Sequence, residues 1–324
     1  MKTFYALNLL SGFFEIAPLI LALNTFGTLQ AFIIVLFYQF GNLIPCPVRL
    51  STSFAKVAAI AGVALLIVFF VWGGFAVLCV SVTLISAAIQ SIRSAIKTDA
   101  SKPAKRWLRV VGFGLGFITT PTFLPVAGLL VAVIVGICKT DKVHNAIIMP
   151  RLNAVNISMI FHQIHYFPYC YAVIMISLFH IGAFPSLLLF LAGWVTYILG
   201  ARLYKGRGLL LSFFIGHGIL LALLLGMFFV PSLSVKAFLW ILTGLVGTTE
   251  FCIVNLARQR GGNKEGEAFA ENAGHVLGVA CGLAAYALTG NLLSTLLVGA
   301  GGAIGAMVLI AILYGGEKYA HSDG

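Results

Sequence analysis

The most constraining feature of this sequence is a succession of apolar stretches, each roughly 17 to 25 residues long, separated by short charged or Gly/Pro-containing segments. A helix of about 20 apolar residues crosses the hydrocarbon core of a bilayer. Only 9% of the residues are charged and 60% are hydrophobic, whereas soluble domains carry about 25% charged residues. The solvent around most of this chain must therefore be lipid, and the sequence predicts an all-α membrane protein.

Twelve transmembrane helices are predicted from these stretches. We place them near 4–25, 29–47, 56–73, 75–92, 107–120, 122–138, 155–180, 184–203, 208–229, 236–256, 270–289 and 292–314. The connections expected on one side of the membrane are very short, which leaves no room for a domain there. The largest connections lie on the other side. The Gly- and Lys-rich segment Arg258–Glu267 is expected to be a mobile loop.

The distribution of basic residues tests this division. If the amino terminus is inside, all but one of the 20 Lys and Arg residues fall in inner segments, and the exception is Lys236. Such a bias is typical of loops on the cytoplasmic side. We therefore expect both termini to be cytoplasmic and the chain to lie in the plasma (inner) membrane. The net charge of +11 then reflects these loops and does not indicate a nucleic-acid partner.

Six spans, a basic connector and six further spans form a repeated plan, with halves at 1–138 and 155–324 and a connector at 139–154. The loop after the eighth span reads Gly-Ala-Arg-Leu-Tyr-Lys-Gly-Arg-Gly over Gly200–Gly208, and the loop after the second reads Gly-Asn-Leu-Ile-Pro-Cys-Pro-Val-Arg over Gly41–Arg49. In its six-plus-six plan and in these two loops, this chain resembles the major facilitator superfamily, whose signature loop is Gly-x-x-x-Asp-Arg-x-Gly-Arg. The Asp of that signature is absent from both loops.

The resemblance implies two pseudo-symmetric six-helix halves around a central cavity lined by the first, fourth, seventh and tenth spans. It implies secondary transport of a small solute by alternating access. In that family the signature loops act as an inner gate, which makes Arg49, Lys205 and Arg207 gate candidates here.

Two carboxylates lie well inside predicted spans, Glu15 in 4–25 and Glu250 in 236–256. An ionisable group within the membrane is costly and is therefore a functional candidate. Both are predicted to carry proton coupling or to bind a cationic group. A neutral, hydrogen-bonded glutamic acid with a structural role is the alternative for each.

Polar residues recur on one side of the predicted helix 155–180. Their spacing places five of them on one stripe, with Tyr171 on the opposite side; the five are Ser158, His162, His165, Tyr166 and Tyr169. Because polar groups facing lipid are costly, the stripe is expected to line the cavity and contact substrate. Interhelical hydrogen bonds or aromatic packing would explain the same pattern. Gln90, in the fourth span, is a further cavity candidate.

The start of the predicted span 270–289 carries Glu271 and His275, which are four residues apart and could pair as a gate. His217 and His180 are interpreted as structural. Glycines four residues apart, as in Gly112/Gly116 and Gly274/Gly278, predict close helix contacts.

Other classes of protein remain open on this sequence. A metal-ion or metal-chelate carrier could use the histidines, Cys170 and a glutamate as ligands. A His-bearing membrane enzyme, such as one with a haem between facing histidines, is a less favoured alternative. The sequence contains no phosphate-binding Gly-x-x-x-x-Gly-Lys-Ser/Thr loop. We expect a non-enzyme with no cofactor and no resident metal, acting as a monomer on a small molecule or ion.

Overall fold

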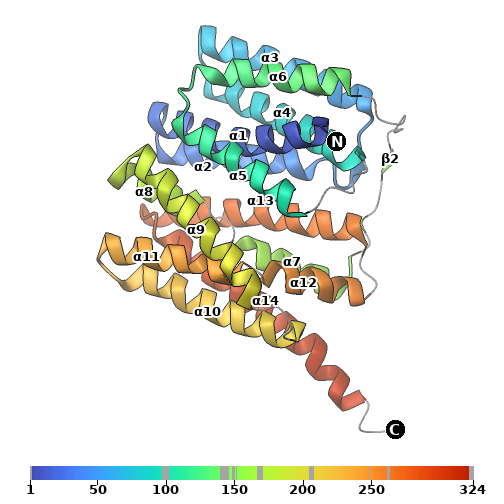
Figure 1. Cartoon of the computed structure of the whole chain (residues 1–324), viewed down its shortest axis with the longest axis vertical. Coiled ribbons are helices and arrows are strands. Elements are labelled where there is room, and N and C mark those ends of the chain that lie inside the picture. Colours follow the sequence, from blue (N-terminus) through green and yellow to red (C-terminus); the bar gives the residue numbers. More distant parts are fainter. Residues whose placement is uncertain are drawn as a thin grey trace. The chain divides into compact units, whose positions relative to one another are not determined.

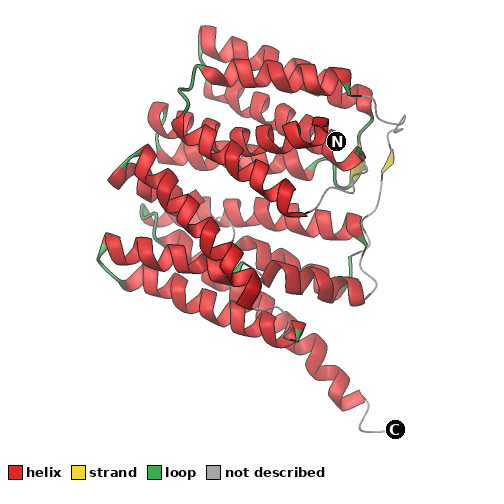
Figure 2. Cartoon of the chain, viewed as in Figure 1, coloured by secondary structure: helices red, strands yellow, loops and turns green. Residues whose placement is uncertain are grey.

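The chain is almost entirely helical (Figures 1 and 2). Its structure, a computed structural model, describes residues 2–96, 102–138, 146–147, 150, 152–165, 171–203, 208–247, 249–260 and 263–320. Side chains at 48–49, 102–106, 146–147, 201–203, 250 and 315–320 are not described. The chain divides into two compact units, Met1–Met149 and Pro150–Gly324. Each unit is described by itself.

Unit 1 contains six helices in its described part. They are α1 (Lys2–Thr25), α2 (Thr28–Leu43), α3 (Thr52–Trp72), α4 (Phe75–Ala95), α5 (Lys102–Ile118) and α6 (Phe123–Ile137). Two short strands depart from the all-α expectation: β1 (Val48–Arg49) pairs antiparallel with β2 (Ala146–Ile147). Helix ends carry local signals, such as the Ser51 hydroxyl that accepts the Phe54 N–H at the start of α3, which satisfies an otherwise unpaired donor.

Close glycine contacts join α1 and α5. A Cβ on Gly112 would overlap the Leu9 carbonyl, and a Cβ on Gly12 would overlap the Arg109 carbonyl. The two backbones can therefore touch only because both positions lack a side chain. This confirms the predicted use of Gly112 as a packing residue. The other main contacts of unit 1 are α3 with α4, α2 with α4, and α3 with α6.

Unit 2 contains eight helices in its described part. They are α7 (Ala154–Ile164), α8 (Val173–Ile181), α9 (Ala183–Leu203), α10 (Leu209–Phe229), α11 (Leu233–Thr243), α12 (Thr249–Gln259), α13 (Lys264–Thr289) and α14 (Ser294–Ala320). A short 3-10 helix, η2 (Gly244–Val246), follows α11. Helix α7 packs against α13 and α14, and α10 packs against α14, α11 and α12.

Two of the predicted spans each contain two helices. The span 155–180 contains α7 and α8, and residues 166–170 between them lie outside the described residues. The span 236–256 contains α11 and α12, which corrects the prediction of one regular helix, because Gly244 and Gly247 lie in η2 and the turn after it. A Cβ on either glycine would overlap side chains of α9, Thr196 and Tyr197. The break therefore allows α11 and η2 to approach α9 closely.

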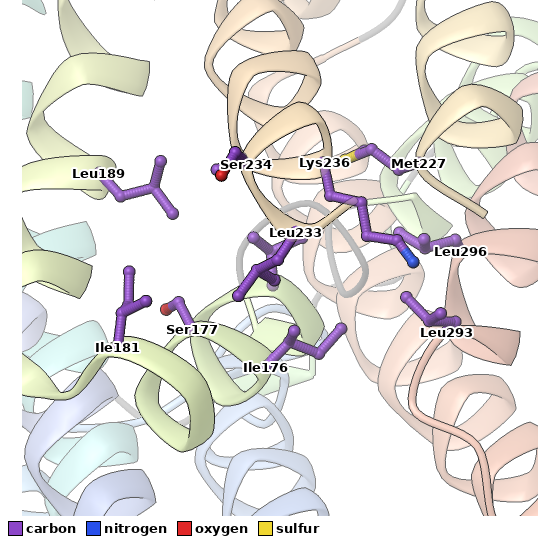
Figure 3. Close-up of a pocket in the computed structure, with 12 residues that line it drawn as sticks. Ile176, Ser177, Ile181, Leu189, Met227, Leu233, Ser234, Lys236, Leu293 and Leu296 are labelled. Atoms are coloured by element: carbon purple, nitrogen blue, oxygen red, sulfur yellow. The ribbon is translucent and has the colours of Figure 1, made fainter. Parts of the chain in front are cut away.

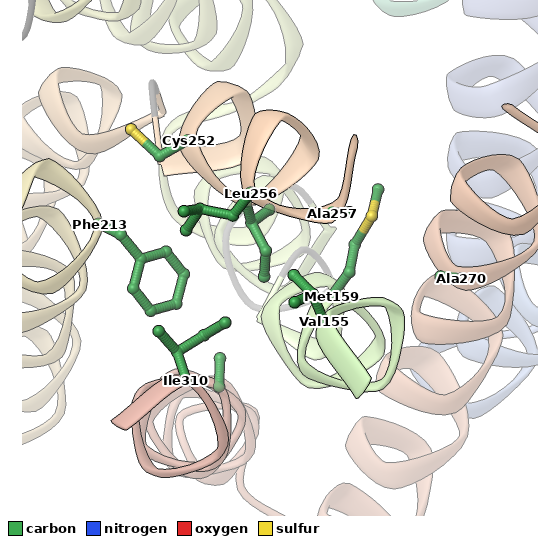
Figure 4. Packing of buried hydrophobic residues seen from close by; sticks show 10 residues of the cluster. Val155, Met159, Phe213, Cys252, Leu256, Ala257, Ala270 and Ile310 are labelled. Carbon is green, nitrogen blue, oxygen red and sulfur yellow. The ribbon is translucent and has the colours of Figure 1, made fainter. Parts of the chain in front are cut away.

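The apolar core of unit 2 lies where α7, α10, α12 and α14 meet (Figure 4). Phe213 of α10, Leu256 of α12 and Ile310 of α14 are almost fully buried there. Asn153 begins α7 with a capping box to Asn156 and also donates to the carbonyls that end α12. One side chain thus fixes two helix ends.

Seven helical segments of the described chain are long and apolar enough to cross a membrane. They are α1, α3, α4, the Ala183–Gly200 part of α9, α10, Leu233–Gln259 and α14. The other helices of unit 1, together with α7, are shorter apolar helices. The helical composition and these spans make the chain an integral membrane protein.

Candidate functional site

Glu15 forms an ion pair inside unit 1. Its Oε2 accepts from Arg109 Nε at 3.1 Å and from Arg109 Nη2 at 2.5 Å. The Glu15 side chain is 0% exposed and that of Arg109 is 26% exposed. Sequence reasoning placed Arg109 among the basic residues of an inner segment and did not find this pair. The Gly112/Gly116 spacing close to Arg109 is the sequence signal that could have pointed to it, because these glycines let α5 pack closely on α1 beside Glu15.

A chain of hydrogen bonds lies next to this ion pair. The Tyr38 hydroxyl of α2 contacts Ser11 Oγ at 3.2 Å, and Arg93 Nη1 of α4 donates to the same Ser11 oxygen at 3.2 Å. Arg93 Nη1 also donates to Gln90 Oε1 at 3.3 Å. Tyr38 interacts electrostatically with both Glu15 and Arg109. Gln90 is thus the end of a polar network that links α1, α2 and α4.

A second polar site lies in unit 2, between α7 and α10. His162 Nδ1 lies 2.9 Å from His217 Nε2, and His217 Nδ1 lies 2.9 Å from the Phe213 carbonyl. A carbonyl only accepts, so His217 Nδ1 carries a proton and, in the neutral ring, its Nε2 accepts from His162 Nδ1. His162 is 2% exposed and His217 is 0% exposed. Sequence analysis assigned His217 a structural role and did not predict that it would meet His162.

Helix α7 makes polar contacts on its other neighbours as well. Gln163 Oε1 lies 3.0 Å from His275 Nε2 of α13, and Ser158 donates to the Ala306 carbonyl of α14 at 3.0 Å. His165 lies against His162, with ring centroids 4.6 Å apart. His275 therefore contacts Gln163, and the predicted pairing of His275 with Glu271 stays a prediction.

The predicted stripe on 155–180 is therefore divided among several neighbours. Ser158 and His162 are buried and bonded to different helices, which favours the alternative interpretation of interhelical hydrogen bonds. Helix α7 ends at Ile164, before Tyr166 and Tyr169, which lie outside the described residues. Tyr171, expected on the opposite side, is fully buried.

Several predicted site residues are outside what the structure describes. Tyr166, Tyr169, Lys205 and Arg207 are outside the described residues, and so is Cys170. For Arg49 in β1 and Glu250 in α12 the backbone is described but the side chain is not. The roles predicted for these residues stay predictions.

The nitrogens His162 Nδ1 and His217 Nε2 lie 2.9 Å apart and form a hydrogen bond with each other. Protein zinc sites use three or four protein ligands. Among the described residues, no group of three or more His, Cys, Asp or Glu side chains could hold a metal ion.

Comparison with known proteins identifies the fold. No family model matches the sequence. No curated protein matches it either. Among solved structures, the chain is similar to the nucleoside transporter NupG (D323A mutant), with a TM-score of 0.63 and 11% identity over 96% of this chain and 98% of that one. The chain has a major facilitator superfamily fold.

A second solved structure is the major facilitator superfamily transporter FucP in its outward conformation. The similarity covers 95% of this chain and 97% of FucP, with 13% sequence identity and a TM-score of 0.48. With a major facilitator superfamily fold established by the first comparison, the resemblance noted in the sequence is confirmed at the level of fold. The low identities carry no substrate over to this chain.

Proposed function

We propose that this protein is a secondary active transporter that moves a small solute across the plasma (inner) membrane by alternating access, and that Glu15 couples the transport to protons. The observation that carries the proposal is the Glu15–Arg109 ion pair, buried within a transporter fold. A carboxylate with no exposure is stable as an anion only while its partner compensates the charge. Protonation of Glu15 would release Arg109, so one proton could shift the contact between α1 and α5.

The repeated packing pattern supports two six-helix halves. In unit 1 the first helix packs on α5 and the third on α6; in unit 2, α7 packs on α13 and α10 on α14. If α7 with α8 and α11 with α12 each form one interrupted span, the helices amount to the twelve predicted spans. Interrupted helices at such positions are typical of transporters. In this proposal both termini are cytoplasmic.

The topology is tested by labelling. Single cysteines at positions 97 and 264, in a variant without native cysteines, are expected to resist a membrane-impermeant maleimide in right-side-out cells, because both belong to predicted inner segments. A cysteine at position 232 is the matched outer control and is expected to react. Ready labelling at position 97 or 264 would contradict the topology.

The coupling is tested by transport. Proteoliposomes are first screened with radiolabelled nucleosides, sugars and organic acids under an imposed pH gradient. With the solute found, Glu15→Gln is expected to abolish accumulation driven by the pH gradient while exchange of labelled for unlabelled solute continues. Glu265→Gln, which removes a partly exposed carboxylate at the start of α13, is the control and should accumulate normally. Gradient-driven accumulation by Glu15→Gln would reject coupling at this residue.

A metal-ion or metal-chelate carrier and a His-bearing enzyme are not proposed. No observation favours either, because the buried imidazole nitrogens His162 Nδ1 and His217 Nε2 bond to each other at 2.9 Å.

A further inference from the structure

A pocket in unit 2 lies where the ends of five helices come together (Figure 3). Its apolar wall comes from Ile176 of α8, Leu189 of α9, Met227 of α10, and Leu293 and Leu296 at the start of α14. Lys236 of α11 is its one charged lining residue. The cavity volume is about 150 Å³. An apolar cavity of about this size holds a molecule as large as benzene.

Among the residues that the structure describes, no carboxylate pairs with the Lys236 ammonium. Figure 3 shows its side chain running from α11 toward Leu293 and Leu296, with the nitrogen at the far end. No ion pair or side-chain hydrogen bond involves it among the residues that the structure describes. None of the nine Asp and Glu residues in the sequence belongs to the short loops that close this end of unit 2, Gly182–Phe184, Val230–Ser234 and Thr289–Asn291. A compensating anion must therefore come from outside these loops.

Helix ends add to the positive field around this ammonium. Lys236 lies near the start of α11, which begins at Leu233, and α14 begins at Ser294 beside the same pocket. The start of a helix carries partial positive charge, so a cation there is unfavourable and an anion is favourable. An anion bound beside Lys236 would therefore be favoured by the ammonium and by both helix starts.

From the size, the apolar wall and the lone ammonium, we propose that this pocket binds a small carboxylate whose apolar part is about as large as a benzene ring. The carboxylate accepts from Lys236 Nζ, and the apolar part lies against Ile176, Leu293 and Leu296. The volume is too small for both acyl chains of a phospholipid, which favours a water-soluble acid over a membrane lipid. The site does not depend on the proposed transport mechanism, and its failure would leave that mechanism untouched.

The test uses three fluorinated probes of one shape and different charge. The full-length protein is placed in phosphatidylcholine nanodiscs, and binding of 4-fluorobenzoate, 4-fluorobenzyl alcohol and 4-fluorobenzylamine is measured by ¹⁹F NMR line broadening. We expect the carboxylate to bind tightest and the amine weakest. Unlabelled benzoate is expected to displace the bound carboxylate probe. Equal binding of the three probes, or tighter binding of the amine, would overturn the proposal.

Variants then assign the binding to this pocket. Lys236→Met removes the charge and leaves an unbranched side chain that is one atom shorter. It is expected to weaken 4-fluorobenzoate binding about tenfold or more, the scale of one charged hydrogen bond, while the alcohol binds as before. Lys264→Met, at the start of α13, is the matched control and should leave the binding of both probes unchanged. Leu293→Phe narrows the pocket and should weaken the binding of both probes.

Two further results bear on the assignment. Lys236→Arg keeps a cation and should retain the preference for the carboxylate, which supports the proposal even where Lys236→Met does not fold. Unchanged 4-fluorobenzoate binding in a folded Lys236→Met protein would overturn it. Loss of probe binding when phosphatidylglycerol replaces phosphatidylcholine would assign the pocket to an anionic lipid and would also overturn it.

Discussion

The polar interiors of the two units use different chemistry on similar pairs of helices. In unit 1 the contact between α1 and α5 holds an ion pair, Glu15 with Arg109. In unit 2 the contacts of α7 with α10 and α13 hold neutral partners, His162 with His217 and Gln163 with His275. An ion pair loses most of its interaction when one proton is added, whereas the histidine pair is fixed by a chain of neutral hydrogen bonds. This difference is the reason why the proposed proton coupling is assigned to unit 1 and not to unit 2.

The largest expected effect comes from breaking the ion pair. Glu15→Ala leaves the Arg109 guanidinium without its carboxylate and should lower the free energy of unfolding by about 3 kcal/mol, since removing one partner of a buried pair leaves an uncompensated charge. The double variant Glu15→Gln, Arg109→Gln removes both charges and should recover most of this loss. Thermal unfolding in detergent, followed by tryptophan fluorescence, measures both. A double variant as unstable as Glu15→Ala would show that the charges do not compensate each other.

A smaller effect is expected from the glycines that bring the helices together. Gly112→Ala places a methyl group against the Leu9 carbonyl, which is backbone and cannot rotate away. Overpacking of this kind costs about 1 to 3 kcal/mol. Gly301→Ala in α14, which has nothing within 4 Å of the added carbon, is the matched control and should be neutral or slightly stabilising. Equal melting temperatures for the two variants would mean that α1 and α5 are not in close contact.

The smallest effect is expected at the histidine pair. His162→Gln and His217→Gln, taken singly and together, form a double-mutant cycle whose coupling energy should be about 1 kcal/mol, the net value of a neutral hydrogen bond. The cycle is measured by thermal unfolding as above. A coupling energy as large as that of Glu15 with Arg109 would remove the distinction between the two units.

Much of the fold was predictable because it depends on local composition. Apolar stretches and the bias of basic residues indicate the spans without knowledge of their partners, and the glycine spacing predicted that Gly112 and Gly278 would pack closely. Gly278 indeed lies against α7, where a Cβ would come within 2.6 Å of the Ile164 carbonyl. The contact made by the break in 236–256 was not predictable from local sequence, because it depends on a neighbouring helix. Gly244 and Gly247 lie against Thr196 and Tyr197 of α9, and nothing near them in the sequence identifies that neighbour.

The candidate sites were harder to predict because they are made by pairs far apart in sequence. Glu15 was found as an unusual intramembrane carboxylate, but its partner Arg109 looked like one more basic residue of an inner segment. His162 was chosen from its stripe, yet the stripe assumed a regular helix and one common neighbour. Arg258 and Glu267 were assigned to a loop, whereas they end α12 and begin α13 and form an ion pair at 2.7 Å. The end of α12 and the start of α13 thus place the guanidinium beside the carboxylate.

The separation of Glu15 and Arg109 in sequence also has a consequence for biosynthesis. The two residues are 94 positions apart, and a ribosome adds about 5 to 20 residues per second, so Glu15 waits roughly 5 to 20 s for its partner. An unpartnered carboxylate is expensive in hydrocarbon during this interval. We therefore expect the nascent first helix to stay with the insertion machinery until α5 arrives. Release of the newborn protein into the bilayer would then follow the order in which charges meet, which differs from the order in which helices are made.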